Sequence, residues 1–162
     1  MNERAQFVLA KLQEKGLTLA SVESVTGGLF GATFTDIPGA SKVYVGGIVC
    51  YSTELKKKLV GVDPAIIEKH GVVSQQVAVD MVLKARSKLK ADIIISCTGN
   101  AGPDVEPDGK AVGRVCLGMY YNGYTWGIPL DLKGSREEIR EDTVDAMLGF
   151  IASLFREVQR KK

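Results

Sequence analysis

The chain has 162 residues, of which 45% are hydrophobic and 25% charged, and its formal net charge at pH 7 is +2. This composition is typical of one soluble globular domain that can bury a core without disulfide bonds. The near-balanced charge argues against a nucleic-acid partner, and the lack of any apolar stretch approaching roughly 18 residues argues against a membrane-spanning helix.

Helical and extended patterns alternate through the first 90 residues. In chain order, the expected elements are a helix at 2–15, a strand at 17–22, a helix at 29–35, a strand at 43–51 and helices at 54–60, 64–69 and 75–89. Gly16 ends the first helix, and Thr53 is placed to cap the helix at 54–60. Asp63 precedes Pro64 at the start of the next helix, and Ser74 begins the last of the three.

The second half of the chain predicts a strand, a loop, a hairpin and a long helix. Residues 91–97 are the clearest strand, because their apolar run lacks the polar alternation of a half-exposed strand. A loop at 98–110 precedes a hairpin of 112–121 and 125–132, with Asn122-Gly123 as its turn, and Ser135 begins a helix at 135–159. This order predicts a three-layer α/β/α sandwich with a mixed, largely parallel sheet, in a single domain over residues 1–162.

The cysteines and the one histidine restrict the possible chemistry. Cys50, Cys97 and Cys116 lie in apolar runs without a CxxC spacing, which indicates buried free thiols in a reducing compartment. His70 lies at a predicted helix end, so neither a cysteine–histidine nucleophile nor a zinc site is expected. Because no signal-peptide core follows Met1, we expect a cytoplasmic protein with no membrane partner.

Three polar segments follow predicted strands, at 23–28, 51–56 and 98–103. Ligands of open α/β sheets bind outside the carboxyl ends of the strands, so these segments are the candidate site. The first contains the hydroxyls of Ser24 and Thr26, then Gly27 and Gly28 at the start of a helix, where amide groups can bind a phosphate or an oxyanion. The alternative is a capping serine or threonine in a tight turn.

The other two segments add a candidate base and a candidate ligand-binding loop. Lys56 follows Tyr51 across a strand-to-helix turn, and a lysine acts as a general base when its surroundings lower its pKa toward neutrality. An exposed helix lysine is the alternative. Thr98 and Gly99 begin a loop whose backbone could approach a ligand, or which binds none. Together the segments indicate a small-molecule site with a serine-type nucleophile and no metal.

An ordered series of motifs resembles one known family. The matching segments are 23–28 (AES(C/L)TGG in the family), 38–41 (PGSS), 47–52 followed by Lys56 (GxVxYS…K), 71–74 (GAVS), 98–103 (TGIAGP), 112–113 (the VG of PVG) and 136–140 (R-x-x-[IV]-R). The chain therefore resembles the CinA C-terminal domain family over nearly its whole length, in that family's free-standing form.

This resemblance implies an amidohydrolase that acts on a linear amide C–N bond without cofactor or metal. Its substrate would be nicotinamide mononucleotide, converted to nicotinic acid mononucleotide and ammonia in pyridine nucleotide salvage. Ser24 would be the nucleophile, Lys56 the base that activates it, and Tyr51 an aid in proton transfer. A serine hydroxyl is a weak nucleophile unless such a base is adjacent.

The resemblance also implies roles in substrate binding. Ser41 and Thr98 would line the reacting amide, and backbone amides within 24–28 are candidates for the oxyanion hole. Arg140, with Arg136 as the second candidate, would bind the 5′-phosphate, because a guanidinium can pair with two phosphate oxygens. The family further leads us to expect a homodimer or a larger homo-oligomer.

The chain departs from the family pattern in one loop. Asn100 replaces the usual Ile, Ala111 replaces a Pro, and residues 104–110 lack the usual Gly-rich run. Because this loop is expected to shape the pocket wall, two other functions stay open. They are a non-catalytic nucleotide-binding or competence- and damage-related interaction module, and an amidase for a different small amide.

Overall fold

A computed structural model describes residues 2–156 of the chain. Five strands form one sheet in the order β2-β1-β3-β4-β5. Their bounds are β1 Leu19–Glu23, β2 Tyr44–Val49, β3 Ile93–Gly99, β4 Arg114–Tyr121 and β5 Tyr124–Asp131. β1 pairs in parallel with β2 and β3, whereas β4 is antiparallel to both β3 and β5. The predicted mixed sheet is therefore confirmed, with β4 as the strand that runs opposite to the others.

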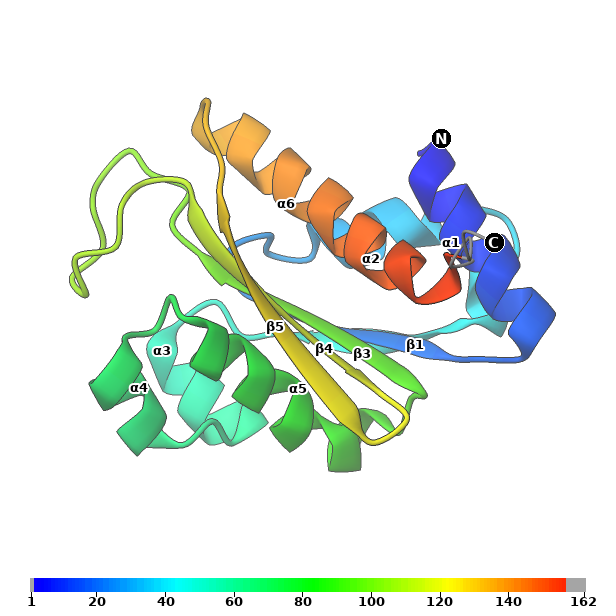
Figure 1. The fold of residues 1–162 in the computed structure, drawn as a ribbon, viewed down its shortest axis with the longest axis horizontal. Coiled ribbons are helices and arrows are strands. Elements are labelled where there is room, and N and C mark those ends of the chain that lie inside the picture. The colour runs from blue at the N-terminus through cyan, green and yellow to red at the C-terminus, as the bar shows by residue number, and fades with distance from the viewer. Residues whose placement is uncertain (1, 157–162) are drawn as a thin grey trace, which may run out of the picture.

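Helices cover both faces of the sheet, which confirms the predicted three-layer architecture (Figure 1). One layer contains α1 (Glu3–Lys15), α2 (Leu29–Thr35) and α6 (Arg136–Ala152). The other contains α3 (Thr53–Leu55), a π-helical turn η2 (Lys56–Val60), α4 (Pro64–His70) and α5 (Gln75–Leu89). Short 3₁₀ turns, η1 (Ala40–Lys42) and η3 (Ser153–Phe155), precede β2 and follow α6. None of the helices within residues 2–156 is long and apolar enough to cross a membrane.

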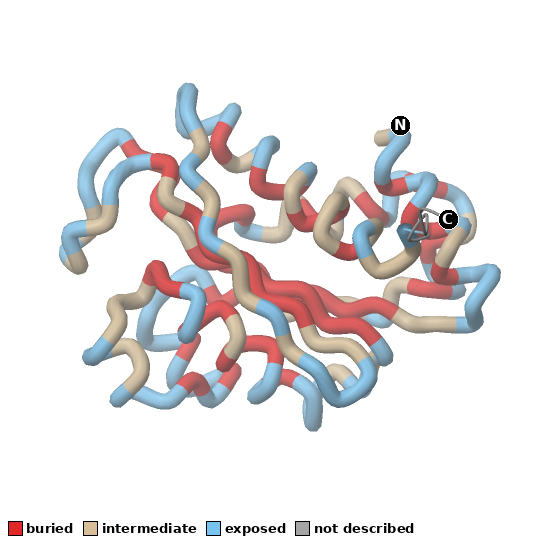
Figure 2. Tube along the Cα trace, viewed as in Figure 1, coloured by how far each residue is buried: buried red, intermediate tan, exposed pale blue. Residues whose placement is uncertain are grey.

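The core lies on both faces of the central strands. β1 is buried along its whole length and β3 along all but its last residue, as an apolar strand between two helical layers should be (Figure 2). Phe30, Phe34 and Leu12 pack on one face, and Met81 and Val82 of α5 pack on the other. The free cysteines Cys50, Cys97 and Cys116 are buried, as expected.

Most predicted boundaries hold to within two residues, and three predictions about helices were wrong. The residue that caps α3 is Ser52, whose Oγ accepts a hydrogen bond from the Leu55 amide, and not Thr53. The predicted α-helix at 54–60 is instead one α-helical turn followed by the π-helical η2. The last α-helix ends at Ala152, earlier than predicted, and is followed by the 3₁₀ turn η3, while residues 157–159 of the predicted helix lie outside the described residues.

Register brings the three polar segments to the same edge. Glu23, the last residue of β1, pairs with Val49 of β2 on one side and with Cys97 of β3 on the other. The segments that begin at Ser24 and Cys50 therefore leave the sheet beside Thr98 and Gly99, the last two residues of β3.

Close packing of α5 on β4 gives a stability prediction. A Cβ added at Gly118 would overlap the Ala78 carbonyl group and lie 2.6 Å from Ser96 Oγ. Gly118→Ala should therefore lower the free energy of unfolding by about 2 kcal/mol, since backbone cannot move aside cheaply. In the helical control Gly149→Ala the nearest atom is the flexible Arg4 guanidinium at 3.3 Å, so stability should stay constant or rise by up to about 1 kcal/mol. Urea unfolding measures both, and equal effects would contradict the packing argument.

Candidate active site

A cleft of about 320 Å³ opens at the carboxyl ends of β1, β2 and β3. All three predicted polar segments reach it, as the strand register requires. The predicted site residues that line it are Ser24, Tyr51, Lys56, Thr98, Gly99 and Arg136. Glu106, from the loop that departs from the family pattern, also lines it and was not singled out from the sequence.

Lys56 and Ser24 meet inside this cleft. The Lys56 Nζ lies 2.7 Å from Ser24 Oγ, 3.0 Å from the Cys50 carbonyl oxygen and 3.2 Å from the Tyr51 carbonyl oxygen. Both side chains are buried, with Lys56 only 2% exposed. A neutral amine can donate its two N–H groups to the two carbonyls, which leaves its lone pair directed at the Ser24 hydroxyl. This is the geometry that a general base needs.

Burial lowers the pKa of Lys56 from its ordinary value of 10.5, because desolvation disfavours the charged amine. Glu106 acts in the opposite direction as a negative neighbour, and so would Cys50 and Cys97 if their thiols were ionised. Burial raises the pKa of Cys50 to about 11 and also raises the pKa of Cys97. Both thiols are therefore uncharged at neutral pH, and Glu106 is the neighbour that still opposes deprotonation of Lys56.

The π-helical turn accounts for the burial of Lys56 between exposed neighbours. The amides of Gly61 and Val62 both donate to the Lys56 carbonyl, at 3.1 and 2.9 Å, which widens the turn. Gly61 ends it with a φ of 95°, a conformation that favours glycine. Lys57 and Lys58 remain exposed. Single π-turns often occur at functional sites because they re-aim one side chain, and here that side chain is Lys56.

Glu23 was missed in the sequence, although it organises the turn that carries Ser24. Its buried carboxylate accepts hydrogen bonds from Thr26 Oγ1 at 2.6 Å, from the Phe30 amide at 2.8 Å and from the Gly31 amide at 3.1 Å. It thereby satisfies free donors at the start of α2. The signal in the sequence was an acidic residue between a strand and a helix N-terminus.

The other predicted binding residues of this turn lie outside the cleft lining. Thr26 is fully buried and bonded to Glu23, so its hydroxyl is structural and does not face the cleft. The Gly27 amide donates to the Ser24 carbonyl at 3.0 Å, and neither Gly27 nor Gly28 lines the cleft. Both glycines have positive φ, 58° and 105°, so their role is to form the turn.

The two arginines of α6 have different surroundings. Arg136 donates to the Tyr51 hydroxyl at 2.7 Å and to the Gly102 carbonyl, and it lines the cleft. Arg140 donates to the carbonyls of Val25 and Thr26, at 3.2 and 2.8 Å, so it clamps the Ser24 turn. Of the two predicted phosphate candidates, Arg136 therefore lines the cleft, whereas Arg140 lies outside the cleft lining.

Three further predicted residues differ in their placement. The Tyr51 phenol bonds to Arg136, and it is the Tyr51 carbonyl that contacts Lys56. Thr98 lines the cleft while its hydroxyl donates to the Val72 carbonyl at 2.9 Å. Ser41 lies before β2, at the edge where the parallel strands begin, so the structure does not bring it to Ser24.

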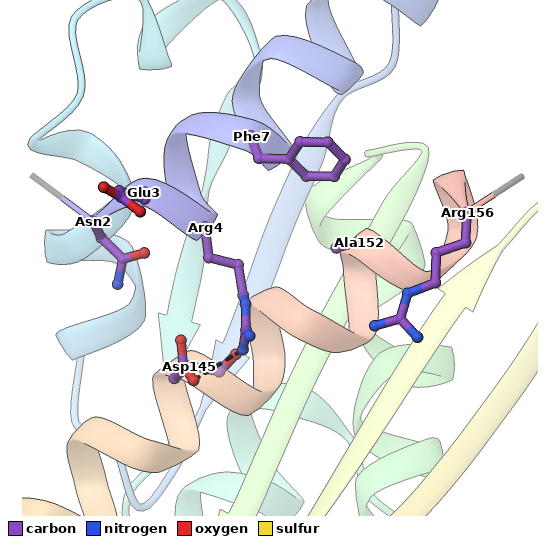
Figure 3. Close-up of a pocket in the computed structure, with 7 residues that line it drawn as sticks. All are labelled: Asn2, Glu3, Arg4, Phe7, Asp145, Ala152 and Arg156. Atoms are coloured by element: carbon purple, nitrogen blue, oxygen red, sulfur yellow. Dashed lines mark hydrogen bonds and ion pairs between the residues drawn. The ribbon is translucent and has the colours of Figure 1, made fainter.

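A larger hollow, of about 570 Å³, lies between α1 and α6 (Figure 3). An ion pair between Arg4 and Asp145, 2.9 Å apart, crosses it, and Phe7 and Arg156 border it. The residues lining it include no serine, cysteine or lysine that could serve as a nucleophile or base. Within residues 2–156, no group of three or more His, Cys, Asp or Glu side chains could hold a metal ion.

The chain is thus an α/β/α domain with a buried serine–lysine pair at the carboxyl edge of its sheet. It belongs to the CinA C-terminal domain family, whose model matches residues 1–155. A "Putative competence-damage inducible protein" from Halalkalibacterium halodurans is 44% identical over 134 residues, which are 82% of this chain and 32% of that protein. The chain spans about a third of the length of this relative and of several similar ones.

Two other relatives match over nearly their whole length. "Protein MG115 homolog" from Mycoplasma pneumoniae is 38% identical over 156 residues, which are 95% of this chain and 98% of that protein. The crystal structure of "competence/damage inducible protein CihA" from Agrobacterium tumefaciens superposes with a TM-score of 0.90 at 31% identity, and covers 95% of this chain and 94% of that one. These matches agree with the resemblance inferred from the motifs.

Proposed function

We propose that this protein hydrolyses the carboxamide of nicotinamide mononucleotide to nicotinic acid mononucleotide and ammonia. The substrate comes from the family resemblance, and the chemistry is supported by the 2.7 Å contact between Lys56 Nζ and Ser24 Oγ. Both groups are buried, and desolvation favours the neutral form of the amine.

The proposed reaction has two steps. In the first, Ser24 Oγ attacks the carboxamide carbon while Lys56 takes the hydroxyl proton, then returns it to the leaving nitrogen as ammonia departs. In the second, water attacks the acyl-enzyme ester, and Lys56 passes the water proton to Ser24 Oγ as the acid leaves. The Val25 amide, next to the nucleophile in the cleft lining, is the candidate oxyanion donor, because the amides of Gly27, Phe30 and Gly31 have other partners.

Arg136 is the candidate for binding the 5′-phosphate. It lines the cleft, and its guanidinium is fixed in position by Tyr51 and Gly102. Thr98 and Gly99 also line the cleft, and because glycine has no side chain the backbone there can approach the substrate closely.

The test is ammonia release from nicotinamide mononucleotide in a buffer that contains a metal chelator. We expect turnover, with kcat/KM increasing with pH until Lys56 is deprotonated, because the base acts only when neutral. Free nicotinamide should react far more slowly, since it lacks the phosphate. Binding of the mononucleotide with no ammonia from neutral to alkaline pH would reject the proposal in favour of a non-catalytic nucleotide-binding module.

A further inference from the structure

The loop that departs from the family pattern is held by its own side chains. Asn100 Nδ2 donates to the carbonyls of Asp104 and Lys110, at 2.9 and 3.4 Å, and Asn100 Oδ1 accepts from the Gly102 amide at 2.9 Å. One buried amide therefore ties the beginning of the loop to its end.

A second anchor joins the loop to the segment before α5. The Asp108 carboxylate accepts from the amides of Val73 and Lys110, at 3.2 and 3.0 Å. Lys110 Nζ in turn donates to the His70 carbonyl at 3.1 Å. Glu106 lies between the two anchors, in a tight turn closed by a 2.8 Å bond from the Gly109 amide to its carbonyl.

Glu106 contributes the carboxylate of the cleft lining. The other ionisable residues of that lining are Lys56, Tyr51 and Arg136. Among the described residues, the Glu106 carboxylate forms no ion pair within 4.0 Å. With the Cys50 and Cys97 thiols uncharged, Glu106 is the negative residue that shares the cleft lining with the reacting amine, and it favours the protonated, inactive form of Lys56.

A carboxylate that keeps Lys56 protonated is unfavourable for catalysis unless the bound ligand neutralises its charge. A cationic group bound beside Glu106 would cancel its effect on Lys56 and gain an attraction at the same time. The cleft then offers one cation, Arg136, and one anion, Glu106, to a ligand with the opposite arrangement of charges.

We propose that Glu106 is a specificity-determining residue that selects carboxamides on a permanently cationic ring, namely N-alkylated pyridinium carboxamides that carry an anionic group. This inference rests on the proposed function and narrows its substrate class. The anionic group pairs with Arg136, and the ring carries its positive charge next to the amide that Ser24 attacks.

The test compares nicotinamide mononucleotide with its reduced form, whose dihydropyridine ring is neutral while the ribose phosphate is unchanged. We measure kcat/KM for both in the wild type, in Glu106→Gln and in Asp104→Asn. Asp104 is an exposed carboxylate of the same loop that lies outside the cleft lining, so it controls for net charge. The ratio of the two values should fall about fivefold in Glu106→Gln and stay constant in Asp104→Asn. Comparing ratios between variants cancels the difference in reactivity of the two amides.

A second readout separates charge from structure. Removing the Glu106 charge lowers the pKa of Lys56, so the acid limb of kcat/KM against pH should move to lower pH in Glu106→Gln and not in Asp104→Asn. An unchanged ratio in Glu106→Gln overturns the inference, whatever the absolute rates are.

Direct binding keeps the inference testable if the proposed reaction fails. In that case the wild type releases no ammonia, and calorimetry with the Ser24→Ala protein and its Glu106→Gln derivative replaces kinetics. Weaker binding of the oxidised mononucleotide alone in the derivative supports the role of Glu106. Equal weakening of both forms, or none, overturns it.

Discussion

Ammonia release from nicotinamide mononucleotide should fall by at least about a thousandfold when Ser24 is replaced by alanine. Ser24 Oγ is the group that would form the covalent bond, and the methyl group of alanine leaves Lys56 with no hydroxyl to activate. Lys56 keeps its two carbonyl partners, so the free energy of unfolding should change by no more than about 1 kcal/mol. Steady-state ammonia assays and urea unfolding measure the two effects.

Ser41→Ala is the matched control. Ser41 is exposed and lies at the opposite edge of the sheet, so its replacement should leave turnover within about twofold of the wild type. Wild-type turnover in Ser24→Ala would mean that another residue is the nucleophile. A large loss in Ser41→Ala would instead show that the assembled enzyme brings this serine into a site that a single chain does not complete.

Lys56→Met should also abolish turnover, by about a thousandfold or more, because Ser24 loses its base. Methionine fills a similar volume without the amine. Lys57→Met is the control, since Lys57 is the exposed neighbour in the same π-turn and should keep wild-type activity. Near-normal turnover in Lys56→Met would contradict the serine–lysine mechanism.

Comparing the stability of the wild type with that of Lys56→Met tests the protonation state of Lys56. Its pKa is lowered in the folded chain, so between that value and the ordinary 10.5 the unfolded chain binds more protons. The Lys56 contribution to the free energy of unfolding therefore rises with pH through this window. The stability of the wild type relative to Lys56→Met should increase as pH rises toward 10.5. A pH-independent difference would mean that the amine has the same pKa in both states.

Much of the fold could be predicted from local patterns. The bounds of α2 were predicted without error, because small-residue turns flank a short apolar helix on both sides. The Asn122-Gly123 turn was equally clear: both residues adopt positive φ, 51° and 85°, as a two-residue hairpin of this kind requires. That the carboxyl ends of β1, β2 and β3 lie at one edge of the sheet followed from the predicted parallel order of these strands.

The partners of individual side chains could not be predicted in this way. Ser24 and Lys56 are 32 residues apart, so no local spacing reports their contact, and the family resemblance had to pair them. That resemblance did not show that the Thr26 hydroxyl donates to Glu23 or that Arg140 donates to the Thr26 carbonyl. These hydrogen bonds depend on which donors and acceptors the tertiary packing leaves free. The π-turn at Lys56 was missed because its residues have ordinary helical propensity.

The helix α6 follows all five strands in the sequence, and the cleft depends on it. Arg136 ties the Tyr51 hydroxyl to the Gly102 carbonyl, and Arg140 holds the Val25 and Thr26 carbonyls. A nascent chain that ends before residue 135 carries Ser24 and Lys56 but lacks the hydrogen bonds of both arginines. The cleft should therefore acquire its final shape only after α6 has been synthesised and has packed on the sheet.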